Sequence, residues 1–387
     1  MSARWRVRRH LLVTNDFPPK VGGIQNYLWD LWSRLDPASF VVLTASSDPA
    51  AAAFDAEQAE RGIRIERVPG PILFFPTVGA RNLVRRCVAE HEIDLVLLDP
   101  ALPLGLLGPH IGVPYGVVLH GAEVTVPARL PGSRAALRRV LDGAALIVSA
   151  GAYPATEGRR AAPASTAHVV EVPPGVDAIA VTPMKAPERR AARARQGLST
   201  DGPLVVSVSR LVPRKGMDVL IEAANRLAPS YPDLTLVVAG DGRERGRLGR
   251  LAARSTLDVR VLGRISDEDR ATLLGAADVF VMACRNRWLG LEQEGFGIVF
   301  LEAAAAGVPQ IAGASGGAHE AVLHGVTGLV VDQPDDPGAV AEALRALLAD
   351  PARRRRMGRA ARTRVVESFD TGVLASRLAD ALAGVAI

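Results

Sequence analysis

His10-Leu-Leu-Val-Thr14 is followed directly by Asn15-Asp-Phe-Pro-Pro-Lys-Val-Gly-Gly-Ile-Gln25. The first stretch is a short apolar run, which predicts a buried strand, and the second contains residues typical of a turn. Gly22 and Gly23 let the backbone approach a ligand closely, and the helix expected after them offers free N–H groups to an anion. The stretch is neither a P-loop nor a G-x-G-x-x-G pattern, which counts against a kinase or a dehydrogenase. Taken alone, it is equally well interpreted as a tight turn that binds nothing.

Similar apolar runs recur along the chain, with helical stretches between them. In the first half they are 10–14, 40–44, 93–98, 115–120 and 145–149, and in the second half 204–208, 234–239, 259–262, 279–282, 309–312 and 328–331. Continuous apolar runs of this length are typical of parallel strands covered on both faces. The sequence therefore predicts an α/β protein with two Rossmann-like doubly wound domains facing a cleft. We expect domains over 1–175 and 188–368, a linker over 176–187, and a C-terminal helix over 369–387 that returns to the first domain.

Composition narrows the classes of function. Of the 387 residues, 48% are apolar and 22% are charged, so the chain can bury a core. Charged residues interrupt every apolar run well before the roughly 20 residues that a membrane span needs. Two distant cysteines, Cys87 and Cys284, exclude a disulfide scaffold and a cysteine zinc cluster and fit a reducing cytosol. The net charge of +5 favours anionic partners, but 4% aromatic residues argue against nucleic acid.

Two polar sites follow predicted strands, where ligands bind in open α/β sheets. His120 opens His120-Gly-Ala-Glu123 and can hydrogen-bond a substrate hydroxyl, although a structural histidine is the more usual finding. No second histidine stands at metal-ligand spacing, so we expect no metal site. Arg210 and Lys215 can converge on a diphosphate, and the alternative is a solvated basic loop. That alternative is weakened because Lys215 is one of only three lysines.

The most specific pattern is Glu294-Gly-Phe-Gly-Ile-Val-Phe-Leu-Glu302, which places two acids eight residues apart. Glu294 is expected in a loop, free to accept hydrogen bonds from sugar hydroxyls. The amides of Gly297 and Ile298 are expected at a helix start that faces the cleft. Glu302 falls about two turns into an apolar helix, where an unpartnered carboxylate is costly to bury and a ribose diol would satisfy it. If no ligand binds, both acids are surface carboxylates.

Together, these four motifs resemble the retaining family 4 glycosyltransferases of GT-B fold over nearly the whole chain. A narrower resemblance, to the phosphatidylinositol mannosyltransferases, rests on the 15–25 and 290–302 stretches, Cys284-Arg-Asn-Arg287 and Gly313-Ala-Ser-Gly-Gly317. The resemblance implies that the second domain binds the donor GDP-mannose and the first binds the acceptor. It assigns donor contacts to Gly23, Arg210, Lys215, Arg264, Ile265, Glu294, Gly297, Ile298 and Glu302. It places His120 beside the sugar, with Arg210, Lys215 and Glu294 also in the catalytic set, and turns Asn15, Asp16 and Gln25 toward the acceptor.

The resemblance further implies transfer of a second, α-1,6-linked mannose to a phosphatidylinositol mannoside, with retained configuration and no cofactor. A glycolipid acceptor requires peripheral contact with a membrane. Pro71-Ile-Leu-Phe-Phe-Pro76 followed by Arg81, Arg85 and Arg86 suits an anionic inner leaflet, although a helix packed in the first domain explains it equally well. Two other functions stay open: a GT-B transferase with another nucleotide sugar and acceptor, and a non-catalytic nucleotide-sugar-binding protein.

Overall fold

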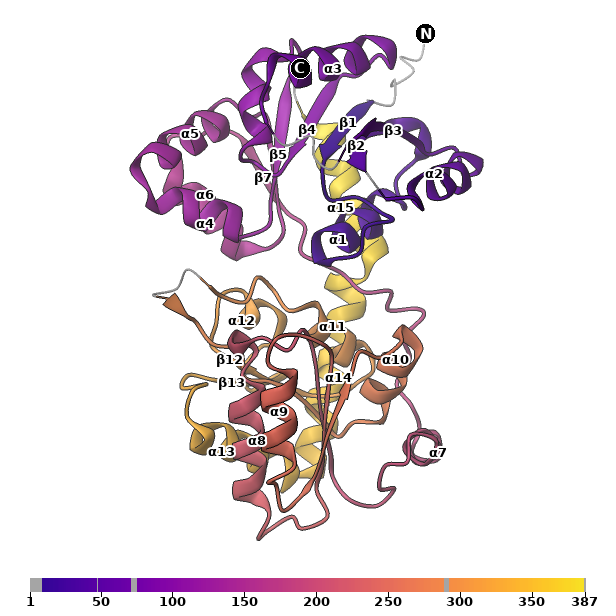
Figure 1. The fold of residues 1–387 in the computed structure, drawn as a ribbon, viewed down its shortest axis with the longest axis vertical. Helices are drawn as coiled ribbons and strands as arrows, with labels where there is room; N and C mark the ends of the chain where they lie inside the picture. Colours follow the sequence, from indigo (N-terminus) through magenta and orange to yellow (C-terminus); the bar gives the residue numbers. More distant parts are fainter. Residues whose placement is uncertain (1–8, 47, 71–74, 289–291, 386–387) are drawn as a thin grey trace. The chain divides into compact units, whose positions relative to one another are not determined.

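The computed structural model describes the chain except residues 1–8, 47, 71–74, 289–291 and 386–387. It divides into two compact units (Figure 1). Unit 1 consists of Met1–Gly175 with Thr371–Ile387, and unit 2 of Val176–Asp370. The predicted doubly wound α/β architecture is present in both. No helix within the described ranges is long and apolar enough to cross a bilayer.

Unit 1 is built on a seven-stranded parallel sheet with the order β3-β2-β1-β4-β5-β6-β7. Its strands are β1 (His10–Thr14), β2 (Phe40–Ser46), β3 (Arg64–Pro69), β4 (Leu95–Asp99), β5 (Tyr115–Leu119), β6 (Leu146–Ser149) and β7 (His168–Glu171). The strand order reverses between β1 and β4, where Thr14 pairs with Asp99 at the carboxyl ends of the two strands. Such a reversal is where ligands bind in open α/β sheets.

Helices cover both faces of this sheet. They are α1 (Gly23–Trp32), α2 (Ala51–Glu60), α3 (Val78–Glu90), α4 (Ala122–Arg129), α5 (Pro131–Asp142), α6 (Ala152–Ala161) and the C-terminal α15 (Thr371–Gly384), with short 3-10 turns at Pro37–Ser39 and Leu104–His110. Helix α15 packs beside α1, and Leu374 and Leu378 are fully buried in the same cluster as Trp32. The last helix is therefore part of the unit 1 core.

Unit 2 is built on a six-stranded parallel sheet with the order β10-β9-β8-β11-β12-β13. Its strands are β8 (Leu204–Val208), β9 (Thr235–Ala239), β10 (Asp258–Gly263), β11 (Val279–Met282), β12 (Gln310–Gly313) and β13 (Gly328–Val331). The order reverses between β8 and β11. The loops after these two strands carry the basic and acidic motifs found in the sequence.

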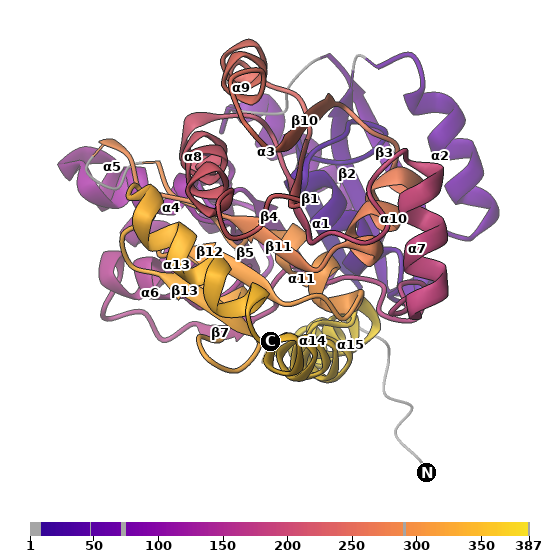
Figure 2. The same cartoon turned by 90° about the horizontal axis from the view of Figure 1, so that it is seen from below.

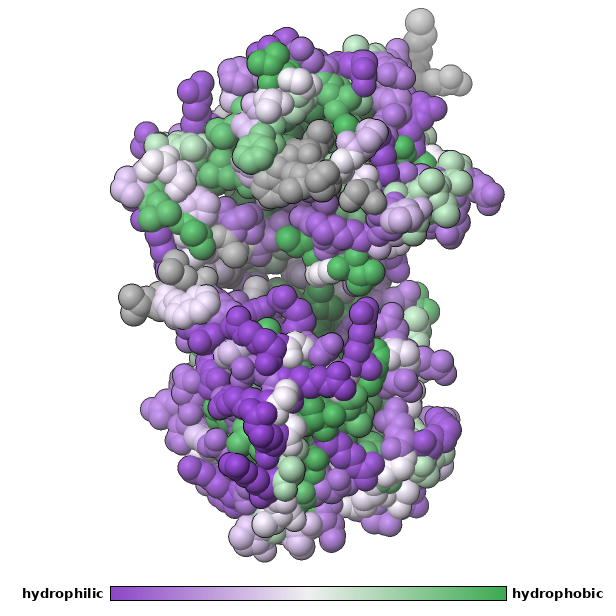
Figure 3. Space-filling view, in the orientation of Figure 1, coloured by the Kyte–Doolittle hydropathy of each residue, from purple (hydrophilic) through white to green (hydrophobic). Residues whose placement is uncertain are grey.

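The helices of unit 2 bury one apolar cluster on each side of its sheet. They are α7 (Ala186–Arg195), η3 (Pro213–Lys215), α8 (Met217–Leu227), α9 (Arg245–Ala252), α10 (Asp267–Ala276), α11 (Ile298–Ala305), α12 (Ala318–Ala321), α13 (Pro337–Leu348), α14 (Pro351–Arg364) and the π-helical turn η5 (Val365–Phe369). Figure 2 shows this set of helices from below, relative to the view of Figure 1. The face of unit 2 in Figure 3 is mostly hydrophilic, in keeping with its charged helices.

Candidate active site

A close backbone approach shapes the basic loop of unit 2. Gly216 follows η3 with a left-handed φ of 68° and caps α8. A Cβ at this position would lie 2.0 Å from the carbonyl oxygen of Ala283, which follows β11. Only glycine fits both the backbone angle and the close approach. The loops after β8 and β11 are thereby held against one another, which brings Lys215 next to Glu294.

Lys215 and Glu294 form a buried ion pair. The Lys215 Nζ donates a hydrogen bond to Glu294 Oε2 at 2.6 Å, and both side chains are less than 10% exposed. The sequence brought the two residues to one site but assigned the lysine to a diphosphate and the glutamate to a sugar. In the structure, each is the other's partner. A substrate that binds the Lys215 ammonium or the Glu294 carboxylate therefore competes with this ion pair.

Arg214 is the residue of this cluster that sequence reasoning missed. Its Nη1 lies 3.9 Å from Glu294 Oε2, is buried, and makes no hydrogen bond to any residue in the described part of the chain. Burial alone would raise the pKa of Glu294, but the charges of Lys215 and Arg214 lower it below its ordinary value. The exposed Arg210 contributes to the same lowering. Glu294 is thus an ionised carboxylate among three cations.

Two glycines pack closely against the backbone of the acidic motif. A Cβ on Gly316 would lie 2.0 Å from the Glu294 carbonyl oxygen, and one on Gly317 would lie 2.1 Å from that of Gly295. The Glu294 N–H donates to Ser315 Oγ at 3.1 Å. Gly297 takes a left-handed φ of 87° and opens α11, whose first residue is Ile298. These contacts fix the backbone at the helix start.

Glu302 lies in a different environment from the one expected. Its side chain is 21% exposed and its Oε1 lies 3.2 Å from Arg270 Nη2, so the carboxylate already has a partner. A ribose is therefore not needed to give this acid a partner, because α10 supplies a cation from a stretch with no motif of its own, and the contact with a ribose stays a prediction. Nearby in the chain, Arg264 is exposed and Ile265 is half-buried, just after the end of β10. Gly263 at that end has a left-handed φ of 76°.

In unit 1, His120 takes part in a buried hydrogen-bond chain. His120 Nε2 lies 2.6 Å from Asp99 Oδ1, and Asp99 Oδ2 accepts a 2.6 Å hydrogen bond from Thr14 Oγ1. Burial alone would lower the pKa of His120, but the charge of Asp99 and its hydrogen bond outweigh this effect and raise it. The ring also packs edge-on against Tyr27. Sequence reasoning missed Asp99, although it ends β4 directly after the apolar residues 95–98.

The acceptor candidates lie around the same end of the sheet. Asp16 accepts hydrogen bonds from Gln25 at 2.5 Å and from Lys20 at 2.9 Å, and its charge contributes to the raised pKa of His120. Asn15 and Gln25 are both buried. A Cβ on Gly23 would meet nothing within 4 Å, so space is open at the start of α1. The structure thus groups His120, Asp16 and Gln25 in unit 1.

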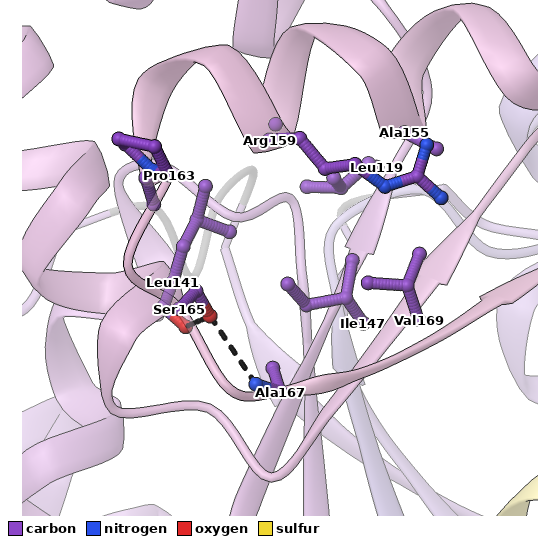
Figure 4. A pocket seen from close by; sticks show the side chains of 11 residues that line it. Leu119, Leu141, Ile147, Ala155, Arg159, Pro163, Ser165, Ala167 and Val169 are labelled. Carbon is purple, nitrogen blue, oxygen red and sulfur yellow. Dashed lines mark hydrogen bonds between the residues drawn. The ribbon is translucent and has the colours of Figure 1, made fainter.

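Unit 1 also contains an apolar cavity of about 410 Å³ between α5, α6 and the sheet. Figure 4 shows Leu119, Ile147 and Val169 reaching into it from the strands, with Arg159 extending over them from α6. Ser165 donates to the Leu141 carbonyl oxygen in its wall. The cavity holds no grouping of acids and bases, and we assign it no catalytic role. Across the described ranges, no group of three or more histidine, cysteine or carboxylate side chains is placed to hold a metal ion.

Comparison with known proteins bears on this geometry. Residues 188–364 match the family model described as glycosyl transferases group 1. The chain is 38% identical over 382 residues to the GDP-mannose-dependent monoacylated alpha-(1-6)-phosphatidylinositol monomannoside mannosyltransferase of Corynebacterium glutamicum, covering 97% of this chain and 98% of the relative. It is 40% identical over 383 residues to the GDP-mannose-dependent alpha-(1-6)-phosphatidylinositol monomannoside mannosyltransferase of Mycolicibacterium smegmatis, with the same coverage.

Solved structures agree on the fold. Anabaena HepE in complex with UDP superposes with a TM-score of 0.79 at 20% identity, covering 96% of this chain and 98% of that one. The sucrose-phosphate synthase of Thermosynechococcus elongatus superposes with a TM-score of 0.76 at 24% identity and the same coverage. The expected GT-B fold is confirmed.

Proposed function

The chain belongs to the glycosyl transferases group 1 family, and on this premise we propose that it transfers mannose from GDP-mannose to a phosphatidylinositol mannoside. The observation that carries the proposal is the 38–40% identity over nearly the full length to two enzymes named for this reaction. The cationic cluster of unit 2 supplies a physical basis for the donor chemistry. The product would carry a second, α-1,6-linked mannose.

The donor diphosphate would lie against Arg210, Arg214 and Lys215. When the bond from the anomeric carbon to the diphosphate breaks, its electron pair passes to the phosphate oxygen and negative charge grows there. Cations held in place before the reaction stabilise that charge without reorganising. Arg214 supports this assignment, because its buried Nη1 has no hydrogen-bond acceptor in the described residues.

Glu294 would contact the mannose once Lys215 interacts with the donor diphosphate as well as with Glu294. Its lowered pKa keeps it an acceptor for sugar hydroxyls. Glu302, held near Arg270, would receive the ribose, with the amides of Gly297 and Ile298 facing the donor. The backbone at Arg264 and Ile265 would meet the guanine. We expect the cationic side chains to do the work that a metal ion does in other transferases.

Retention of configuration requires the acceptor hydroxyl to attack from the face that the diphosphate leaves, or an intermediate nucleophile. We find no carboxylate suited to be that nucleophile, so we favour same-face attack. The hydroxyl oxygen forms the new bond to the anomeric carbon, and its proton passes to the departing phosphate oxygen. His120, held by Asp99, would lie beside the sugar, and Asn15, Asp16 and Gln25 would position the acceptor.

A glycolipid acceptor requires contact with a membrane surface, and α3 is our candidate for it. Val78, at the start of this helix, is 64% exposed and the preceding Phe75 is 72% exposed. Arg85 and Arg86 are exposed on the same helix. The predicted apolar patch at 71–76 lies largely outside the described residues. Exposed apolar side chains next to basic ones suit an anionic leaflet, where the chain would act peripherally on the cytoplasmic side.

Vesicle sedimentation tests the membrane contact. We expect the protein to sediment with anionic vesicles, and the Arg85→Glu/Arg86→Glu variant to bind them at least about thirtyfold more weakly, given about 1 kcal/mol for each of the two basic residues lost near an anionic surface. Equal sedimentation of both proteins would remove α3 from the proposal.

A donor screen tests the reaction itself. Purified protein is titrated with GDP-mannose, UDP-glucose and UDP-N-acetylglucosamine, and transfer to a phosphatidylinositol mannoside is then measured. We expect tight binding and transfer with GDP-mannose alone. Arg210→Ala should lose about 10²–10³ in turnover, whereas Arg195→Ala, an exposed arginine on α7, serves as the matched control. Preference for either UDP-sugar would favour the alternative transferase, and binding without transfer would favour a non-catalytic role.

A further inference from the structure

Two adjoining cavities open at the amino-terminal edge of the unit 2 sheet, with volumes of about 250 and 510 Å³. Both are bounded by α7 and α14, which Figure 2 labels, and they share Ala186, Arg189, Asp278 and Arg354. Asp278 directly precedes β11, and Pro309, in the larger cavity, directly precedes β12. Glu294 and Lys215 lie beyond the opposite ends of these strands. The two cavities are therefore separate from the candidate donor site.

The walls carry a surplus of positive charge. Seven arginines and two aspartates line the two cavities. Asp278 lies 2.8 Å from both Arg189 and Arg193, and 3.7 Å from Arg354. Burial alone would raise the pKa of Asp278, but the arginines lower it, so it stays ionised. One carboxylate thus forms ion pairs with three guanidinium groups.

Two further arginines have no acceptor. Arg355 and Arg359 are exposed, lie four residues apart on one face of α14, and line the larger cavity. No hydrogen bond or ion pair joins either guanidinium to another residue of the described chain. The buried Nε of Arg189 also has no hydrogen-bond partner among the described residues. These groups offer several N–H donors to one concave site.

The cavity has a fixed frame and an apolar floor. Gly358 lets α14 approach the turn before β12, because a Cβ there would lie 2.0 Å from the Gly307 carbonyl oxygen. Arg362 donates to the carbonyl oxygens of Val181, Ala305 and Ala178, which fastens α14 to the neighbouring segments. Met184 and Val308 supply the apolar surface beside the arginines. A solvated basic helix has neither of these features.

We propose that these two cavities form a binding site for an organic phosphate, with the phosphate against Arg355 and Arg359 and the apolar part over Met184 and Val308. Guanidinium groups bind phosphate oxygens through paired, charge-assisted hydrogen bonds. Anionic phospholipid headgroups and soluble organic phosphates share this chemistry. The proposal does not depend on the identity of the sugar donor or acceptor.

The test uses the full chain with saturating GDP, added to fill the proposed donor site so that it does not compete for the probe. Pyrophosphate binding is measured by calorimetry, and sedimentation is measured with phosphatidylcholine vesicles with and without phosphatidylinositol. The variant is Arg355→Ala/Arg359→Ala. Its control is Arg353→Ala/Arg356→Ala, which removes the same charge from α14 at positions that do not line the cavities. Thermal unfolding of each variant checks that it is folded.

We expect the cavity variant to lose affinity by about tenfold or more, as for the loss of charge-assisted hydrogen bonds, and the control to keep it. A loss confined to pyrophosphate identifies a soluble phosphate as the ligand, and a loss confined to the phosphatidylinositol vesicles identifies a headgroup. Equal binding by the cavity variant and its control in both arms would overturn the proposal, as would the absence of any pyrophosphate or vesicle binding by the wild-type chain.

Discussion

Replacing Lys215 by Met removes the hydrogen-bonding partner of Glu294 but keeps most of the side-chain volume. Breaking a buried ion pair on one side costs about 3–5 kcal/mol, because the remaining charge stays buried. Coulomb energy falls inversely with distance, so Arg214 at 3.9 Å keeps about two thirds of the attraction that Lys215 exerts at 2.6 Å. We therefore expect a loss near the lower limit, about 3 kcal/mol in the free energy of unfolding at pH 7.

The assay is urea unfolding of Lys215→Met, Glu294→Gln and the double variant. The loss in free energy of unfolding in the double variant should be about 2 kcal/mol smaller than the sum of the two single losses, since the two groups are in contact. Lys185→Met changes an exposed lysine and should stay within about 0.5 kcal/mol of wild type. Turnover of Lys215→Met should fall about 10²–10³-fold if the lysine also stabilises the departing diphosphate.

The pH dependence gives an independent check on the pair. The folded pKa of Glu294 is lowered, so its contribution to stability is present above the ordinary glutamate pKa of 4.5 and is lost as pH falls through the folded pKa. The stability difference between wild type and Lys215→Met should therefore shrink in acid. Two results would refute this expectation. One is a Lys215→Met variant as stable as wild type at pH 7, and the other is a stability difference between the two proteins that grows as the pH falls.

Three further changes have defined outcomes. Asp99→Asn should lower the pKa of His120 and shift the pH–rate profile to lower pH. Because the folded pKa of His120 is raised in wild type, the stability advantage of wild type over Asp99→Asn should decline as pH rises above 6.5 through that folded pKa. Gly216→Ala should destabilise by more than about 1 kcal/mol in urea unfolding, because φ is positive and the Cβ meets backbone. Glu302→Gln should weaken GDP binding by about tenfold in calorimetry, as for the loss of a charge-assisted hydrogen bond. Unchanged values in any of these measurements would remove the corresponding role.

The sequence predicted the parallel sheets well because their central strands are buried on both faces and consist of continuous apolar runs. It missed β3 and β7, which lie at the two edges of the unit 1 sheet. Their residues are partly exposed and include Arg64, Glu66 and His168, so neither strand has the apolar pattern of a central one. In unit 2, β10 and β13 are also edge strands, but each keeps a short apolar run and was found.

The candidate site was only partly predictable for a similar reason. Residue type and position after a strand singled out Lys215 and Glu294 separately, and the family resemblance placed both at one donor site. Pairing between them depends on the close approach at Gly216. Arg214 was not predicted as a site residue, because arginines are common in this sequence and the neighbouring Lys215 is one of only three lysines. Arg270 comes from a helix with no motif, so only the fold places it near Glu302. The catalytic and binding roles of these residues stay predictions.

The most direct test of the central claim is the product formed from radiolabelled GDP-mannose and a membrane lipid extract. We expect label in a phosphatidylinositol mannoside carrying one more α-linked mannose, with the label abolished in Lys215→Met and kept in Lys185→Met. Label absent from the phosphoinositide fraction, or transferred equally well by Lys215→Met, would contradict it.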